Sequence, residues 1–205
     1  MTLDDALREC PIIAIVRGIR PDEAVAHADA LFRAGVRVVE APLNSPDPLQ
    51  SIRLIAEAYA GRMVVGAGTV LSPDKVDAVA EAGGRIIVSP NTEPAVIRRA
   101  VELGLPAFPG FGTVSEAFTA YGAGARHLKL FPASSYGPGH VKALLAVLPK
   151  DAKVYAVGGA GPANMAEWTA AGVAGFGLGS ELYKPGQSPD ETFEKATIAV
   201  AAARG

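Results

Sequence analysis

The chain has 205 residues, of which 49% are apolar and 20% are charged, so it can form a large buried core and is not a disordered chain. The net charge is −2 at pH 7, which gives no reason to expect nucleic acid or an anionic membrane surface as a partner. The single cysteine, Cys10, excludes an intrachain disulfide and a metal site built from several cysteines.

The first ten residues, MTLDDALREC, lack the basic segment and apolar run of a signal peptide. No apolar stretch along the chain reaches the roughly 18 residues that a membrane span needs. We therefore expect a cytoplasmic protein that does not insert into a membrane.

Short apolar runs rich in β-branched residues recur along the chain, about eight in all, at intervals of roughly 20 to 27 residues. Each is bounded by glycine or proline, as is typical of parallel strands that are buried on both faces. The candidate strands are PIIAIVRG (11–18), VRVVEAPL (36–43), MVVGAGTV (63–70), RIIVSP (85–90), LPAFPG (105–110), RHLKLFP (126–132), KVYAVGG (153–159) and VAGFGLGS (173–180).

Alanine-rich segments between these runs carry helix start and stop signals. Segment 21–35 begins with Pro21 and two acidic residues and ends at Gly35, which is the expected order for a helix. Segment 72–84 repeats it, with Ser72 as the candidate N-cap. The same pattern recurs in segments 92–104, 113–124 and 161–172.

Eight strand–helix units in one chain predict an α/β fold, a (β/α)₈ TIM barrel that forms a single compact domain over residues 1–205. The alternative that fits the same pattern is an open, doubly wound parallel sheet. No linker or low-complexity segment divides the chain.

Lys129 lies in ARHLKLFPA (125–133), which otherwise reads as a buried strand. An ammonium group is costly to bury unless it is paired or loses its proton. In an apolar pocket the pKa of a lysine falls, and its neutral amine can attack a ketone to form a Schiff base. The protonated imine then stabilises an adjacent carbanion, as the making or breaking of a C–C bond next to a carbonyl requires.

Such a reaction also needs a group that moves protons, and Glu40, at the end of the second strand, is the best-placed carboxylate. Barrel active sites form at the carboxyl ends of the strands, where both residues lie. If Lys129 and Glu40 lie on the inward faces of their strands, both side chains enter the mouth of the barrel. The alternative is that Lys129 and Glu40 form a buried ion pair with a purely structural role.

Glycine turns end the last two candidate strands, at Gly158-Gly159 and at Gly179-Ser180. Glycine lets backbone N–H groups approach an anion closely, and barrels often bind phosphate at this position. The structural alternative is a pair of ordinary tight turns. His27, His127 and His140 are scattered without metal-ligand spacing, so we expect no metal site.

Six motifs, in this order and spacing, resemble the 2-keto-3-deoxy-6-phosphogluconate/6-phosphogalactonate aldolase family over nearly the whole chain: VEAPLNSP, GAGTVL, VSPNTEPAVI, LKLFPA, AVGGAGPANM and GLGSELY. The resemblance implies a class I aldolase, a lyase on a (β/α)₈ barrel, usually a homotrimer, with no metal or other cofactor. Two motifs favour the galactonate branch. LNSP replaces the Leu-Arg-Thr pattern of the gluconate branch, and AVGG lacks its threonine before the glycines.

The resemblance also implies roles for individual residues. Lys129 would form the Schiff base with the pyruvate carbonyl, and Glu40 would act as general acid/base through a bound water. Val157 would lie where the C4 hydroxyl of the substrate is discriminated. The other binding residues that it implies are Arg17 and Thr69 for the carboxylate region, Pro90 and Phe131 for the pocket wall, and Gly158, Gly159, Gly179 and Ser180 for the phosphate.

The implied reaction is the reversible cleavage of a phosphorylated keto-deoxy sugar acid, 2-dehydro-3-deoxy-6-phospho-D-galactonate, to pyruvate and glyceraldehyde 3-phosphate in galactonate catabolism. One alternative is the same chemistry on the gluconate epimer or on both epimers. More distant alternatives are a phosphate-binding barrel epimerase without a Schiff base and a non-catalytic sugar-phosphate binding protein.

Overall fold

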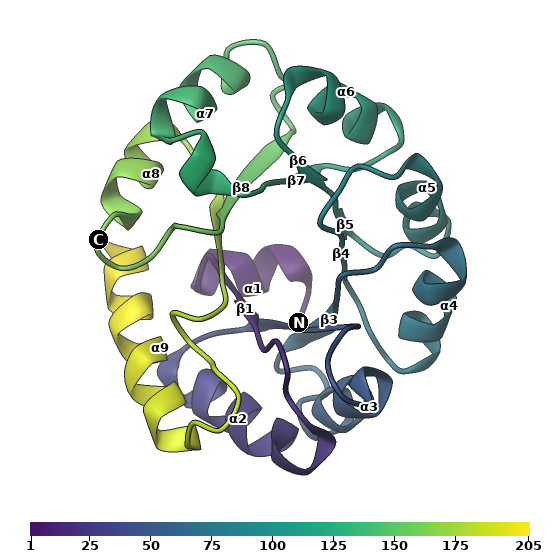
Figure 1. Cartoon of the computed structure of the whole chain (residues 1–205), viewed down its shortest axis with the longest axis vertical. Helices are drawn as coiled ribbons and strands as arrows, with labels where there is room; N and C mark the ends of the chain where they lie inside the picture. Colours follow the sequence, from purple (N-terminus) through teal and green to yellow (C-terminus); the bar gives the residue numbers. More distant parts are fainter.

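Short parallel strands alternate with helices along the chain in the computed structural model, which describes residues 1–205 (Figure 1). The strands are β1 (Ile12–Ile15), β2 (Val38–Pro42), β3 (Val64–Gly68), β4 (Ile87–Val88), β5 (Ala107–Phe108), β6 (Gly110–Phe111), β7 (His127–Leu130), β8 (Lys153–Val157) and β9 (Gly175–Leu178). The helices are α1 (Leu3–Glu9), α2 (Pro21–Ala34), α3 (Pro48–Ala58), α4 (Pro73–Glu81), α5 (Pro94–Glu102), α6 (Val114–Gly122), α7 (Pro138–Leu145), α8 (Met165–Ala171) and α9 (Pro189–Arg204), with a 3₁₀ turn at Ala133–Ser135.

The nine strands form one parallel sheet in the order β5-β4-β3-β2-β1-β9-β8-β7-β6. Strands β5 and β6 are two halves of one barrel position, because only Pro109 separates them. The first half pairs with β4 and the second with β7, and the Pro109 carbonyl accepts a hydrogen bond from the Lys129 N–H at 2.9 Å. The ring therefore closes with eight positions, and the prediction of a (β/α)₈ barrel rather than an open sheet is confirmed.

Helices α2 to α9 surround the barrel as an outer ring (Figure 1). Helices α2, α4, α5, α6 and α8 lie in the five segments that the sequence signals marked, and α2 begins at Pro21 and ends where Gly35 adopts a left-handed conformation with φ 106°. The outward faces of the strands pack on these helices in a cluster of 52 buried residues. No helix is both long enough and apolar enough to cross a membrane.

A second, smaller apolar cluster fills the barrel interior toward the amino-terminal ends of the strands, which we call the lower half; the half toward their carboxyl ends is the upper half. Its side chains come from the inward faces of the strands and include Val38, Val88, Phe108 and Tyr155. Helix α1, which the sequence signals did not predict, lies across this opening (Figure 1), and its buried Ala6 joins the cluster. Helix α1 therefore covers the apolar interior at the amino-terminal end of the barrel, and the other end stays open for a site.

Candidate active site

Two connected cavities lie at the carboxyl ends of the strands, where barrel enzymes place their active sites. The outer cavity, of about 380 Å³, opens to solvent and is lined by Arg17, Phe131 and the two glycine turns. The inner cavity is small and is lined by Lys129, Glu40 and apolar or aromatic side chains. Both cavities share Ile15, Val157 and Gly177 as walls, so they form one continuous pocket with a deep end and a mouth.

Lys129 projects from β7 into the deep end of this pocket, as the strand alternation predicted. Only 7% of the residue is exposed, and its Nζ lies 4.7 Å from the centre of the Phe131 ring. Burial lowers the pKa of Lys129; Glu40 opposes this shift, and the positive charge of Arg17 adds to it. The side chain is thus a largely desolvated amine that lines the inner cavity.

Glu40 enters the same deep end from β2, and only 2% of the residue is exposed. Gly68, on the neighbouring strand β3, leaves the space that the carboxylate occupies, since a methyl group at Gly68 would overlap it. Burial raises the pKa of Glu40 to about 7, although Lys129 and Arg17 both act against this shift. Its Oε2 atom is buried without a hydrogen-bond partner. Such an oxygen is costly unless a ligand or water uses it.

The structural alternative for Lys129 and Glu40 was a buried ion pair. No ion pair within 4.0 Å joins the two side chains, and no hydrogen bond links them. Both line the inner cavity with no N–O distance of 4.0 Å or less between them, so the amine and the carboxylate are near each other but not bonded to each other. The ion-pair interpretation therefore does not describe this structure.

Arg17 follows strand β1 and lines the mouth of the pocket. Its Nη1 donates a hydrogen bond of 2.6 Å to the Oδ1 atom of Asn44, in the loop after β2. The next residues of the two loops are also joined, because the Gly18 N–H donates to the Ser45 hydroxyl at 2.9 Å. The guanidinium is thus directed by a neighbouring loop toward the same end of the barrel as Lys129.

The two glycine turns line the mouth of the pocket together. Gly158 and Gly159 both have positive φ, 81° and 92°, a backbone conformation that L side chains rarely adopt. The backbone N–H groups of Gly158, Gly159, Gly179 and Ser180 donate no hydrogen bond within the chain. Four free donors therefore line one cavity, where they could donate to an anion; that these turns bind the phosphate stays a prediction.

The other residues that the resemblance implied occupy different places. Val157 and Phe131 line the pocket, with Val157 on the wall between its deep end and its mouth. Thr69 and Pro90 follow β3 and β4 at the same end of the barrel, but neither lines the two cavities. Thr69 has φ 57°, a left-handed conformation that is uncommon for a β-branched residue. Their roles stay predictions.

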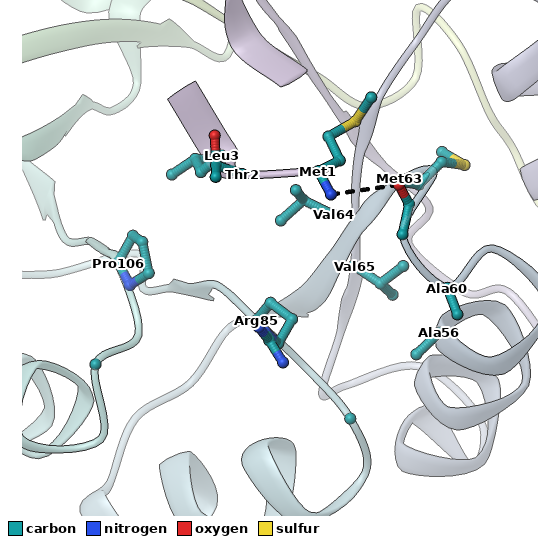
Figure 2. A pocket seen from close by; sticks show the side chains of 13 residues that line it. Met1, Thr2, Leu3, Ala56, Ala60, Met63, Val64, Val65, Arg85 and Pro106 are labelled. Carbon is teal, nitrogen blue, oxygen red and sulfur yellow. Dashed lines mark hydrogen bonds between the residues drawn. The ribbon is translucent and has the colours of Figure 1, made fainter. Parts of the chain in front are cut away.

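A larger cavity, of about 480 Å³, lies at the opposite end of the barrel (Figure 2). Figure 2 shows Met1 and Leu3 next to the start of β3, with Arg85 and Pro106 facing them, and the Met1 amino group donates to the Gly61 carbonyl at 3.3 Å. This cavity has no buried ionisable side chain. We therefore place the chemistry in the smaller pocket around Lys129.

Three residues that support the pocket were not singled out from the sequence: Asn44, Gly68 and Lys184, which lines the mouth. The motifs LNSP, GAGT and LGSELY lie on or next to these positions, so closer attention to the loops could have indicated them. No cluster of three or more histidine, cysteine, aspartate or glutamate side chains could hold a metal ion.

Comparisons with known proteins agree with this geometry. Residues 3–197 match the model of a family described as "Aldolase: KDPG and KHG aldolase". The chain is 54% identical over 194 residues, 95% of both chains, to 2-dehydro-3-deoxy-6-phosphogalactonate aldolase of Escherichia coli K12. A solved structure named "Native KDPGal structure" is 54% identical, with a TM-score of 0.93 over 95% of this chain and 94% of that one.

A more distant solved structure is a KDPG aldolase from Legionella pneumophila, described as holding pyruvate as a covalent carbinolamine intermediate. It is 26% identical, with a TM-score of 0.86 over 99% of this chain and 98% of that chain.

Proposed function

Because the chain belongs to the KDPG and KHG aldolase family, we propose that it cleaves 2-dehydro-3-deoxy-6-phospho-D-galactonate to pyruvate and D-glyceraldehyde 3-phosphate through a Schiff base on Lys129. One observation supports this most strongly. Lys129 is buried without an ion-pair partner and lines the same small cavity as the Glu40 carboxylate, which has an unpartnered oxygen. The curated relative at 54% identity carries the name of this activity.

The first step is attack of the neutral Lys129 amine on the C2 carbonyl of the substrate. The lowered pKa of Lys129 increases the fraction of amine that can attack near neutral pH. The carbinolamine then loses water to give a protonated imine at C2. This imine withdraws electrons from the C3–C4 bond and prepares it for cleavage.

Glu40 then removes the proton of the C4 hydroxyl, through a bound water as the family resemblance implies. The C4–O electrons form the aldehyde, the C3–C4 bond breaks, and its electron pair gives an enamine on Lys129. Glyceraldehyde 3-phosphate leaves, C3 takes up a proton, and water hydrolyses the imine to release pyruvate. A carboxyl with a pKa of about 7 is suited to both accepting and returning a proton at neutral pH.

The two anionic ends of the substrate bind at opposite sides of the mouth. Arg17, held by Asn44, is the cation for the carboxylate next to C2, with Thr69 and Pro90 as further contacts that the resemblance implies. The free N–H groups of the glycine turns donate hydrogen bonds to the phosphate oxygens, as helix N-termini and backbone nests do in other phosphate sites. Phe131 covers the Lys129 amine between these two regions.

Val157 supports the galactonate epimer over the gluconate epimer. It lines both cavities, where the C4 hydroxyl of a substrate bound to Lys129 lies within reach. An apolar side chain offers that hydroxyl no hydrogen bond. It therefore does not stabilise binding of the gluconate epimer, which a hydroxyl-bearing residue at this position would favour. We expect Val157→Thr to shift the ratio of kcat/KM toward the gluconate epimer, by about tenfold or less. A ratio that stays constant would contradict this role for Val157.

The test of the proposed function is turnover of the two epimers by the purified protein, with pyruvate and glyceraldehyde 3-phosphate measured separately. Equal amounts of both products, formed faster from the galactonate epimer, would support the proposal. Faster cleavage of the gluconate epimer would favour the alternative assignment, and ligand binding without turnover would favour the sugar-phosphate binding protein.

The same proposal includes a homotrimer that acts in the cytoplasm and uses the lysine imine in place of a metal. Exposed apolar side chains on the neighbouring helices α5 and α6 support association of copies, since Val101, Val114 and Phe118 are each more than 40% exposed. Light scattering during gel filtration tests the trimer, and turnover in the presence of EDTA tests the absence of a metal.

A further inference from the structure

The phosphate end of the pocket contains a cation that the motifs did not assign. We propose that Lys184 forms an ion pair with the phosphate group of the substrate and fixes the phosphorylated end at the mouth of the barrel. The inference rests on the proposed function, because it assumes a substrate with a carboxylate and a phosphate at opposite ends. Arg17 serves the carboxylate end, so the dianionic phosphate needs another source of positive charge.

Lys184 lines the mouth of the pocket, as the glycine turns do. It lines the outer cavity together with Gly158, Gly159, Gly179 and Ser180, whose backbone N–H groups are free. The residue is exposed, and its ammonium group forms no salt bridge or hydrogen bond within the chain. Lys153 and Lys195, by contrast, are each bonded at 2.7 Å to a neighbouring side chain. Lys184 is thus available to an anion in the cavity.

The backbone on both sides of Lys184 is fixed, so the lysine is presented from a rigid segment. On one side Tyr183 is only 3% exposed, and its hydroxyl donates to Glu23 Oε1 on helix α2 at 3.0 Å. The edge of the same ring packs on the buried His27 at 4.8 Å. On the other side Pro185 lies against Gly18, where an added Cβ would come within 2.7 Å of the proline ring. The backbone around Lys184 therefore loses little conformational entropy when a ligand binds.

One acidic residue, Glu181, also lines this cavity and would repel a phosphate. Its Oε1 is 3.4 Å from the Ser180 hydroxyl, a long hydrogen bond that the hydroxyl can exchange for a phosphate oxygen. The positive charges of Arg17 and Lys184 outnumber this carboxylate at the mouth. A cation that pairs with the phosphate also explains how an anion can bind close to Glu181.

The experiment runs the reaction in the direction of synthesis, from pyruvate with either glyceraldehyde 3-phosphate or unphosphorylated glyceraldehyde. The quantity compared is the ratio of kcat/KM for the two aldehydes. We expect Lys184→Met to lower this ratio by about tenfold or more, mainly through the KM for glyceraldehyde 3-phosphate. Lys184→Arg should recover most of the ratio because it restores the charge. The matched control is Lys150→Met, an exposed lysine outside the pocket, which should leave the ratio unchanged.

Inhibition by inorganic phosphate provides a second measurement that does not depend on the aldehyde. Its inhibition constant should rise in Lys184→Met and return toward the wild-type value in Lys184→Arg. A ratio within twofold of wild type in Lys184→Met, or an equal loss for both aldehydes, would overturn the inference while the aldolase assignment stands. A wild-type protein that makes no product from pyruvate and either aldehyde would overturn the proposed function itself, and this inference with it.

Discussion

Two lysines on neighbouring strands of the barrel have opposite environments. Lys153, at the start of β8, is close to half exposed and forms a salt bridge of 2.7 Å with Asp4 on helix α1. Lys129, on β7, is 7% exposed and has no carboxylate within ion-pair distance. A solvated, paired ammonium is a surface contact, whereas a buried and unpaired amine is held in a state from which it can react.

The same contrast extends to the two halves of the barrel interior. In the lower half, His127 Nδ1 lies 3.0 Å from the Tyr155 hydroxyl, and its ring stacks on Phe108 at 4.6 Å. Burial lowers the pKa of His127 to about 4, so this imidazole is neutral at pH 7 and acts as packing. In the upper half, Glu40 has an unpartnered oxygen. The lower half therefore stabilises the fold, and the upper half leaves polar groups unsatisfied for the reaction.

The largest difference is expected between Lys129→Met and Lys153→Met. Without its nucleophile, Lys129→Met should lose aldol cleavage by on the order of 10³-fold or more, while its stability stays the same or rises because a buried amine is removed. Lys153→Met should keep activity within about twofold of wild type and lose at most about 1 kcal/mol of unfolding free energy. Steady-state kinetics and urea unfolding measure both. Equal losses of activity in the two variants would contradict a catalytic role that belongs to Lys129 and not to Lys153.

Glu40→Gln should lower kcat by about 10²- to 10⁴-fold, because the general acid/base is lost but the lysine remains.

Glu40→Gln should also change how the free energy of unfolding depends on pH. Burial raises the pKa of Glu40 from its usual 4.5 to about 7, so the folded state binds this proton more tightly than the unfolded state does. The contribution of Glu40 to stability is therefore present below pH 4.5 and is lost as the pH rises to about 7.

Unfolding by urea at pH 5 and at pH 7.5 measures this effect. The stability of Glu40→Gln relative to wild type should increase from the lower to the higher pH, because glutamine has no proton to lose. A difference that is constant between the two pH values would mean that Glu40 is not held in its protonated form by burial.

Gly68→Ala is expected to have a smaller effect, on the order of 10² in kcat/KM, because the new methyl group would displace the Glu40 carboxylate. The matched control is Gly122→Ala in helix α6, where an added Cβ meets nothing within 4 Å. That control should keep full activity and gain about 0.5 to 1 kcal/mol of stability. If Gly68→Ala turns over substrate as fast as Gly122→Ala does, the space at Gly68 is not what positions Glu40.

Among the substitutions of residues that line the pocket or support it, Tyr155→Phe should have the smallest effect on activity. The variant keeps the ring that forms the floor of the inner cavity but leaves His127 without its hydroxyl partner. We expect a loss of about 1 to 3 kcal/mol in unfolding free energy and a change in kcat/KM below about threefold. A large drop in kcat with unchanged stability would show that the lower half takes part in the chemistry.

The sequence predicted the barrel well because each strand is marked at both ends by glycine or proline. The strands are shorter than their candidate segments, as in 126–132, where only His127–Leu130 is paired. Helix α1 was not predicted, because it has only seven residues and buries only Ala6, so it has little helical periodicity to detect.

The residues of the candidate site could be predicted from the sequence where a charged residue interrupts an apolar strand. Lys129 and Glu40 are charged residues in apolar strands, and this conflict can be read from the chain. Asn44 and Lys184 are exposed polar residues in loops, where charge is ordinary, and their value depends on which loops meet in space. The function of Gly68 depends on a side chain from another strand, which no local pattern reveals.

The proposed mechanism requires the buried Lys129 to act as a nucleophile. The most direct measurement is the intact mass of wild type and Lys129→Met after treatment with pyruvate and sodium borohydride. We expect one reduced pyruvate adduct on the wild type, located at Lys129, and none on the variant. A wild type without an adduct, or an adduct that persists in Lys129→Met, would contradict the proposed mechanism.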